Sequence, residues 1–323
     1  SFDGTRPMKP NSVGRYMPNF APSQWYMRIG RWLTYCVPMV VLIILVAPLI
    51  TETPGDEWND ENLKLSGIRA IVAQSLLYVA FAVATIIEST RLPGGSPAAS
   101  GMLTSRQTPS HVGIGSLVAA VMIGISALAA VVAGAQIIDV TFSIQPIFLI
   151  GLIISSMGEE VLFRGTILQA LQQKFGTYAA IVITSVLFAS VHLGNPHVEP
   201  LAIVATFLVG LLLGMMTVLT SSLWMPMGFH VVWNLLSSAL FGEVSGLAPV
   251  IRLIDIDTTS IALPSWIFGG SYGIESGAIT ILLIGLSFWI TPKYCKLDPF
   301  ARAARYRIDV WHPSHNQQPS SSS

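Results

Sequence analysis

The chain has 323 residues, of which 52% are hydrophobic and only 11% are charged, whereas about 25% of the residues of a typical soluble domain are charged. The 17 basic residues equal the 17 acidic ones. This balance excludes the strongly basic surface that neutralises phosphates, so we expect no nucleic-acid partner. The two cysteines form neither a disulfide framework nor a Cys-x-x-Cys metal pair. Together these features indicate a helical protein embedded in lipid.

Eight apolar runs are candidates for membrane-spanning helices, because about 20 apolar residues cross a hydrocarbon layer about 30 Å thick. They cover residues 30–50, 66–88, 112–138, 146–171, 177–193, 201–220, 226–241 and 274–291. Only helices and closed barrels satisfy all backbone groups in lipid, and the runs do not alternate with the period of two that a barrel needs. The expected fold class is therefore all-α, a polytopic integral membrane bundle of about eight transmembrane helices.

The ends of the chain differ in composition from the apolar runs. Residues 1–28 are expected to form an N-terminal arm, with Trp25 and Tyr26 as part of an interfacial anchor. Residues 29–140 would form three N-terminal transmembrane helices. Residues 293–323 are basic at first and then polar and Ser-rich, which is typical of a disordered tail.

The distribution of Lys and Arg predicts the orientation in the membrane. With eight spans, both termini lie on the same side, and the opposite side carries only Lys64, Arg69 and Arg252. Cytoplasmic loops are the ones enriched in Lys and Arg. We therefore expect a multi-pass protein with both termini in the cytoplasm.

Three charged residues lie together inside the fourth run, where each costs about 2.5 to 3.5 kcal/mol at a helix centre on insertion scales. Glu160 and Arg164 are four residues apart, so they share a helix face and are expected to pair. Glu159 points about 100° away from Glu160 and is left to face something else. A purely structural ion pair with a protonated spare glutamate is the alternative interpretation.

Two histidines lie at the ends of neighbouring runs. Phe188 and His192 share one helix face, and His230 and Asn234 share another. A single buried histidine is more often a hydrogen-bonded core residue than a catalytic group. Together with Glu159, however, these side chains provide a general base, two imidazoles and an amide donor, which can activate water and stabilise an oxyanion.

These motifs resemble those of the CPBP intramembrane proteases, a group that includes CAAX prenyl endopeptidases and bacteriocin-processing or abortive-infection proteins. Glu159-Glu160-x-x-x-Arg164, Phe188-x-x-x-His192 and His230-x-x-x-Asn234 match the family's motifs in order, and a later Gly269-Gly270-x-x-Gly273-x-Glu275 stretch is similar to one before its last helix. The resemblance implies that residues 141–292 form a CPBP-like catalytic core.

The resemblance also implies a function and a role for each motif residue. The protein would be an endopeptidase that cleaves a membrane-associated protein or peptide, prenylated or not. Glu159 and His192 would activate water, and His230 and Asn234 would stabilise the oxyanion. Glu160, Arg164 and Phe188 would support these groups without reacting.

The sequence leaves the use of a metal open. Glu159, His192 and His230 have the chemistry to hold Zn²⁺ with one position left for water, with a slight preference for this version, and a glutamate and a histidine can also work without metal. One geometric difficulty concerns the two histidines: the predicted spans place His192 and His230 near opposite ends of their helices. They meet only if residues 221–226 dip into the protein or if the fifth helix is short.

Two other functions remain as alternatives. A catalytically idle relative would serve as a subunit or assembly factor of a larger membrane complex. A proton-coupled transporter would use the buried acids, although the chain lacks the repeat symmetry of that class. Three other glutamates, Glu88, Glu199 and Glu275, flank apolar runs and are expected to be solvated or interfacial.

Overall fold

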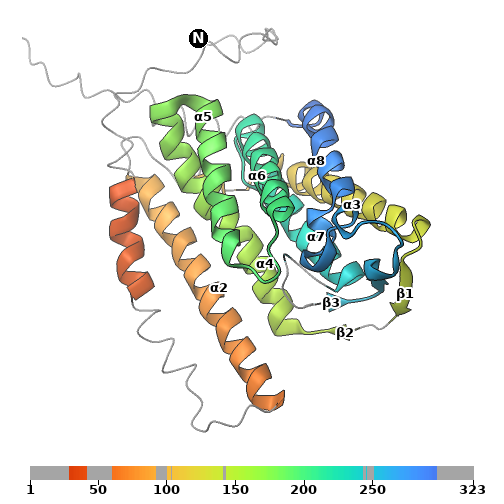
Figure 1. The fold of residues 1–323 in the computed structure, drawn as a ribbon. Coiled ribbons are helices and arrows are strands. Elements are labelled where there is room, and N and C mark those ends of the chain that lie inside the picture. The colour runs from red at the N-terminus through yellow and green to blue at the C-terminus, as the bar shows by residue number, and fades with distance from the viewer. Residues whose placement is uncertain are drawn as a thin grey trace, which may run out of the picture.

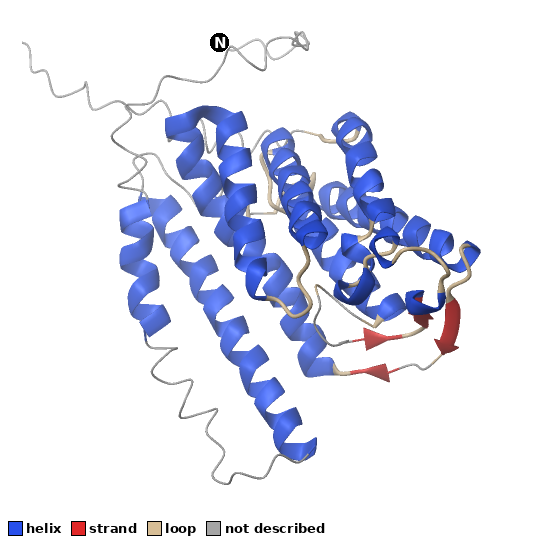
Figure 2. Ribbon diagram, in the orientation of Figure 1, coloured by secondary structure: helices blue, strands red, loops and turns tan. Residues whose placement is uncertain are grey.

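The computed structural model describes residues 29–41, 60–91, 100–102, 104–140, 143–242, 245 and 251–296. The predicted N-terminal arm, residues 42–50 of the first apolar run and the tail after Lys296 lie outside these residues. Helices make up most of the described chain (Figure 1). The few strands lie together at one end of the helical bundle (Figure 2).

The helices follow one another with few long connections. They are a first helix over Ile29–Val41, then α2 (Asp60–Arg91), α3 (Thr108–Val132), α4 (Pro146–Glu160), a π-helical turn (Val161–Ile167), α5 (Leu168–Val191), α6 (Pro200–Thr220), α7 (Trp224–Phe241) and α8 (Ala278–Ile290). Short 3-10 turns cover His192–Gly194, Thr258–Ser260, Ser265–Ile267, Gly270–Tyr272, Ile274–Ser276 and Thr291–Lys293. The strands are β1 (Gln136–Asp139), β2 (Ser143–Ile144), β3 (Ile251–Arg252) and β4 (Asp255–Asp257).

Within the described residues, four helical stretches are long and apolar enough to cross a membrane: Ile71–Arg91, Thr108–Val132, Pro146–Gly194 and Pro200–Thr220. The apolar helices Ile29–Val41 and Ala278–Lys293 are shorter. The predicted class of helical membrane protein is therefore confirmed. The predicted count of about eight membrane-spanning helices is not confirmed.

The longest of these stretches is not one straight helix. Gly176 interrupts α5 with φ 77° and ψ 172°, a conformation that glycine adopts easily and other residues rarely do. The rings of Phe163 and Phe188 lie 5.3 Å apart, whereas a straight helix would separate these residues by about 37 Å at 1.5 Å per residue. The chain therefore reverses at Gly176, as the gap between the fourth and fifth predicted runs indicated.

The predicted C-terminal end of the third helix, from the run over residues 112–138, is wrong. Helix α3 stops at Val132, Gly134 has a φ of 105°, and residues 136–139 form β1 instead. Strand β1 pairs with β4, and β2 pairs with β3, both antiparallel. Apolar residues continued the hydrophobic run past the helix, but the left-handed glycine ended it. The two small ribbons are an addition to the expected all-α fold.

Helices α3 and α7 pack with almost no space between their backbones. A Cβ atom added to Gly115 would overlap the carbonyl oxygen of Met225, and one added to Gly228 would lie 2.6 Å from the carbonyl oxygen of Val112. Small residues allow such close approach between helices in a membrane. This contact lies next to His230 and fixes the depth of α7 in the bundle.

Candidate active site

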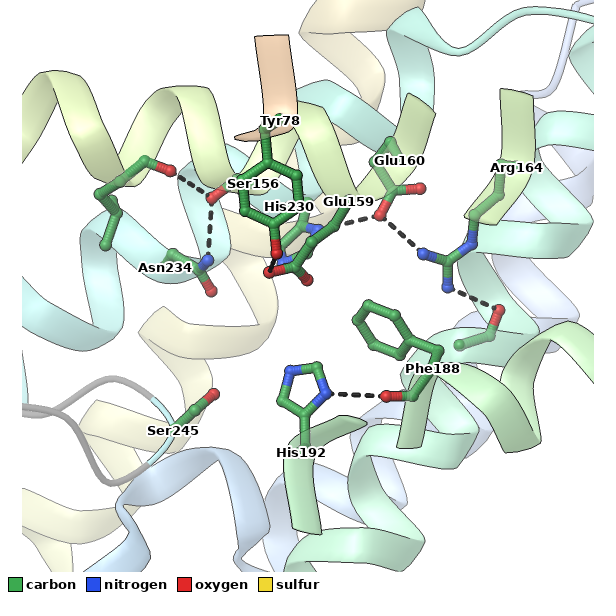
Figure 3. Close-up of polar contacts among 12 residues, drawn as sticks. Tyr78, Ser156, Glu159, Glu160, Arg164, Phe188, His192, His230, Asn234 and Ser245 are labelled. Atoms are coloured by element: carbon green, nitrogen blue, oxygen red, sulfur yellow. Dashed lines mark hydrogen bonds and ion pairs between the residues drawn. The ribbon is translucent and has the colours of Figure 1, made fainter. Parts of the chain in front are cut away.

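The buried ion pair at the end of α4 has the predicted geometry. Arg164 Nη1 donates to Glu160 Oε1 at 2.9 Å, and both side chains are almost completely buried. Arg164 Nη2 also donates to the carbonyl oxygen of Gly210 at 3.3 Å. The guanidinium lies in the π-helical turn and thereby joins the acid cluster to α6 (Figure 3).

His230 makes a second contact with the same glutamate, which the sequence did not predict. Its Nδ1 atom lies 2.9 Å from Glu160 Oε1. An ionised carboxylate only accepts hydrogen bonds, so Nδ1 carries the proton and donates it. The other ring nitrogen, Nε2, is directed toward Glu159 and lies 3.9 Å from its Oε2.

Glu159 faces away from the ion pair, as predicted, and toward α2. The hydroxyl of Tyr78 donates to Glu159 Oε1 at 3.1 Å. Oε2 has no hydrogen-bond partner among the described residues. One carboxylate oxygen is thus held by the N-terminal part of the chain, and the other is buried near His230.

His192 ends the second segment of α5 with its ring turned toward the acid cluster (Figure 3). Its Nδ1 lies 2.8 Å from the carbonyl oxygen of Phe188. Because a carbonyl oxygen can only accept, Nδ1 carries the proton, and in the neutral ring Nε2 is an acceptor. The Phe188 ring lies beside both histidines, with its centroid 4.7 Å from that of His192 and 6.0 Å from that of His230.

Asn234 lies one turn after His230 on α7. Its Nδ2 donates to Ser156 Oγ at 2.9 Å, and Ser156 in turn donates to the carbonyl oxygen of Leu152. A carboxamide has two N–H donors. One is used to orient the side chain, and the other remains for a ligand.

His192, His230 and Asn234 line one pocket, which Phe188 also borders. The conflict over helix depth is resolved because the α6–α7 turn is buried in the protein. Ser222 is 1% exposed and Leu223 is 0% exposed. The second segment of α5, from Gly176 to His192, keeps the length of the predicted run, about 24 Å. The buried α6–α7 turn is therefore the condition that the structure meets.

Glu275 also lines this pocket, together with Tyr272 and Ser245. The expectation that Glu275 is solvated is wrong, since it is only 8% exposed. Glu88, at 1% exposed, was misjudged in the same way. Burial raises the pKa of the Glu275 carboxyl. Burial, followed by the charge of Glu275, raises the pKa of Tyr272. The Gly-rich stretch before Glu275 was the only sequence signal for its position.

A zinc site at Glu159, His192 and His230 stays a prediction from the sequence. Within the part of the chain that the structure describes, no three His, Cys, Asp or Glu side chains are grouped so that they could hold a metal ion. His192 and His230 each use Nδ1 for a hydrogen bond to another group, which leaves both Nε2 atoms free and is the way in which metal-ligating histidines are commonly held. The side chains as placed are compatible with either version of the chemistry.

The chain was compared with known proteins. A search of curated proteins found no match. Residues 141–236 match the family model of the type II CAAX prenyl endopeptidase Rce1-like proteins. The matched segment contains all three motifs, and Tyr78 and Glu275 lie outside it. This match confirms the resemblance drawn from the motifs: residues 141–236 are similar to the Rce1-like CAAX proteases, and they belong to a chain with the apolar helices of a membrane protein.

Proposed function

We propose that the protein is an intramembrane endopeptidase that cleaves a peptide bond near the C-terminus of a membrane-associated, prenylated protein or peptide. The single observation that carries this proposal is the pocket shared by His192, His230 and Asn234, with the Glu159 carboxylate 3.9 Å from His230. The Rce1-like family supports protease activity in general. The prenylated substrate follows from the family name and is the part to be tested.

In the proposed mechanism a water molecule binds between Glu159 and His192. Glu159 Oε2 takes a proton from this water, with His192 Nε2 as the second acceptor, and the water oxygen forms a bond to the peptide carbonyl carbon. The carbonyl oxygen becomes an oxyanion, which the free N–H of Asn234 and the Nε2–H of a protonated His230 stabilise. Such preorganised donors are worth about 2.7 to 4 kcal/mol each in known acyl-transfer sites.

The intermediate then collapses. The C–N bond breaks, its electron pair stays on nitrogen, and nitrogen takes back the proton that the water had given up. Glu160 and Arg164 do not react in this scheme. Glu160 holds His230 through Nδ1 and Arg164 balances its charge, so that the imidazole keeps its orientation through the cycle.

The substrate is tested with purified full-length protein in liposomes. The probe is a peptide ending in a farnesylated cysteine followed by three residues, and its unprenylated counterpart is the comparison. We expect release of the C-terminal tripeptide, measured by mass spectrometry, and faster release from the farnesylated peptide. Equal rates would overturn the prenyl preference, and no release from either peptide would overturn the proposed function.

Zinc stays a prediction from the sequence, and the mechanism above uses no metal. Measuring the zinc content of the purified protein and of His192→Ala by inductively coupled plasma analysis distinguishes a zinc-dependent mechanism from a metal-free one. We expect wild type and variant to contain equally little zinc. One zinc ion per wild-type chain that is lost in His192→Ala would contradict the metal-free mechanism.

We also propose the arrangement of the chain around this site. Residues 141–292 form the catalytic core, residues 29–140 supply helices that support it, and both termini are cytoplasmic. The hydrogen bond from Tyr78 on α2 to Glu159 on α4 is evidence that the N-terminal helices hold the core in place. The paucity of Lys and Arg on the opposite side supports the orientation.

A further inference from the structure

Glu275 is a buried acid that the proposed mechanism does not use. It lies in the 3-10 turn Ile274–Ser276, directly before α8, and is 8% exposed. Removing a carboxyl group from water is costly unless it gains hydrogen bonds or an opposite charge. No Lys or Arg of the described residues forms an ion pair with it at 4.0 Å or less. A buried carboxyl group without a basic partner is stabilised only by hydrogen bonds.

Only one of its two oxygens accepts a hydrogen bond of good geometry. Ser245 Oγ donates to Glu275 Oε2 at 2.9 Å, and Ser245 is itself fixed because Asn195 Nδ2 donates to its carbonyl oxygen at 3.1 Å. Oε1 is buried and makes no hydrogen bond of good geometry with the described residues, although Ser237 and Trp233 lie near enough to stabilise the ionised carboxyl. The side chain is therefore oriented through one oxygen and can accept a hydrogen bond at the other.

Glu275 shares its pocket with the candidate catalytic side chains. His192, His230 and Asn234 contribute to the same lining, and the rest includes the apolar side chains of Ala202 and Val209. The lining also holds polar groups such as Thr206 and Tyr272, so a ligand at the histidines that also satisfies Glu275 needs apolar parts and a hydrogen-bond donor, for which an N–H or ammonium group is suited. A short apolar peptide with a free amino group has this chemistry.

We propose that Glu275 binds the amino group of the peptide released on the leaving side of the cleaved bond. This inference rests on the proposed function, because hydrolysis creates that amine. When the C–N bond breaks, nitrogen keeps the electron pair and receives the proton taken from water. A second proton, from the new carboxylic acid or from solvent, makes it an ammonium group. Glu275 Oε1 then accepts a hydrogen bond from this ammonium.

Binding of product analogues tests the inference without turnover. Trileucine, with a free amino group, and N-acetyl-trileucine compete with a fluorescent tripeptide for full-length protein in detergent at pH 7. We expect the free amine to bind about tenfold more tightly in wild type, because hydrogen bonds to charged groups are among the stronger ones. In Glu275→Gln the preference should fall to about twofold or less.

Two further variants serve as a control and as a second test. Glu199→Gln removes an exposed carboxylate outside the pocket lining and should keep the full preference. Ser245→Ala removes the hydroxyl that orients Glu275 and should reduce the preference, which provides a second test if Glu275→Gln does not fold. An equal preference in wild type and both pocket variants would overturn the inference, as would no preference in wild type.

The two proposals can fail separately. A wild-type protein that prefers the free amine but releases no tripeptide from either substrate would overturn the proposed function and retain the amine site. A protein that cleaves its substrate but binds both tripeptides equally would retain the protease and overturn the role of Glu275.

Discussion

The hydroxyl of Tyr78 is the contact that joins α2 to the proposed catalytic acid. It donates to Glu159 Oε1 at 3.1 Å, and no other described group is recorded as a donor to this carboxylate. The hydrogen bond keeps Oε2 directed toward His230. In the proposed mechanism this hydrogen bond orients the Glu159 carboxylate, because a carboxylate that rotates away from the water cannot act as its base.

Tyr78→Phe should lower kcat about tenfold and leave KM nearly unchanged, since a hydrogen bond to a charged group contributes about 1.5 to 3 kcal/mol. Steady-state cleavage of the farnesylated peptide measures both constants. Tyr35→Phe removes a hydroxyl from the first helix and is the matched control. Wild-type kcat in Tyr78→Phe would show that Glu159 does not need this contact.

The raised pKa of Glu275 predicts a dependence of stability on pH. Its folded-state pKa lies above the unfolded value of about 4.3, so folding favours the protonated form. That stabilisation is complete below the unfolded pKa and is lost as the pH rises through the folded pKa. Glutamine does not titrate. Glu275→Gln should therefore gain thermal stability relative to wild type as the pH rises.

Melting temperatures of the two proteins in the same detergent, from pH 4 to pH 8, test this prediction. Because His230 and Tyr272 interact electrostatically with Glu275, the difference in Tm reports the titration of Glu275 together with its effect on these two groups. A difference in Tm that does not change with pH would show that Glu275 has an ordinary pKa.

The sequence predicted the local contacts of the site and missed the distant ones. Glu160 with Arg164, and Phe188 with His192, are four residues apart, and helical periodicity alone places them together. The contacts of His230 with Glu160 and of Tyr78 with Glu159 join residues about seventy to eighty positions apart. They depend on how helices pack, which a single sequence does not reveal.

Helices α2 and α4 meet along a row of glycines. A Cβ atom on Gly151 would overlap the side chain of Ile71, and one on Gly158 would overlap that of Tyr78. The contacts are seven residues apart on both helices, which is two helical turns and one shared face. Gly158 precedes Glu159, so the same close approach brings Tyr78 to the carboxylate.

Gly158→Ala should push α2 away, destabilise the protein by about 1 to 3 kcal/mol as overpacking does, and lower the cleavage rate. Gly124→Ala is the control, because a Cβ atom there meets no other atom within 4 Å. The measurements are Tm and initial rate in the same detergent. Equal values for the two variants would contradict the importance of this contact.

At the level of elements, apolar run length was a good predictor of where helices begin and a weaker one of where they end. The break at Gly176 was marked by a polar interval. The end of α3 was not, because residues 135–138 are mostly apolar. The buried α6–α7 turn was considered only because the two histidines had to meet. Its depth results from tertiary packing, which hydropathy does not record.

The arrangement of the whole molecule predicts opposite exposure for the two ends of the bundle. The turn at Gly176, with Lys174, lies at one end of the α4–α5 hairpin, and strands β2 and β3 lie at the other (Figure 1). The first end belongs to the side that the positive charges assign to the cytoplasm.

Single cysteines in a variant without Cys36 and Cys295 test this orientation. Thr5→Cys and Ser321→Cys should react with a membrane-impermeant maleimide only after the cytoplasmic side is opened, and Gly55→Cys should react in intact cells or vesicles. If residues 5 and 321 react from opposite sides, the chain crosses the membrane an odd number of times and the proposed topology is wrong.

The central claim is that Glu159, which lies beside His230, activates the water that attacks a peptide bound in the pocket of His192, His230 and Asn234. Its most direct test is the single-turnover rate of Glu159→Gln on the farnesylated peptide, with folding checked by Tm. Loss of a general base costs about 100-fold to 10,000-fold, so we predict a fall of at least about 100-fold with peptide binding retained. A folded Glu159→Gln protein that cleaves at the wild-type rate would contradict the account.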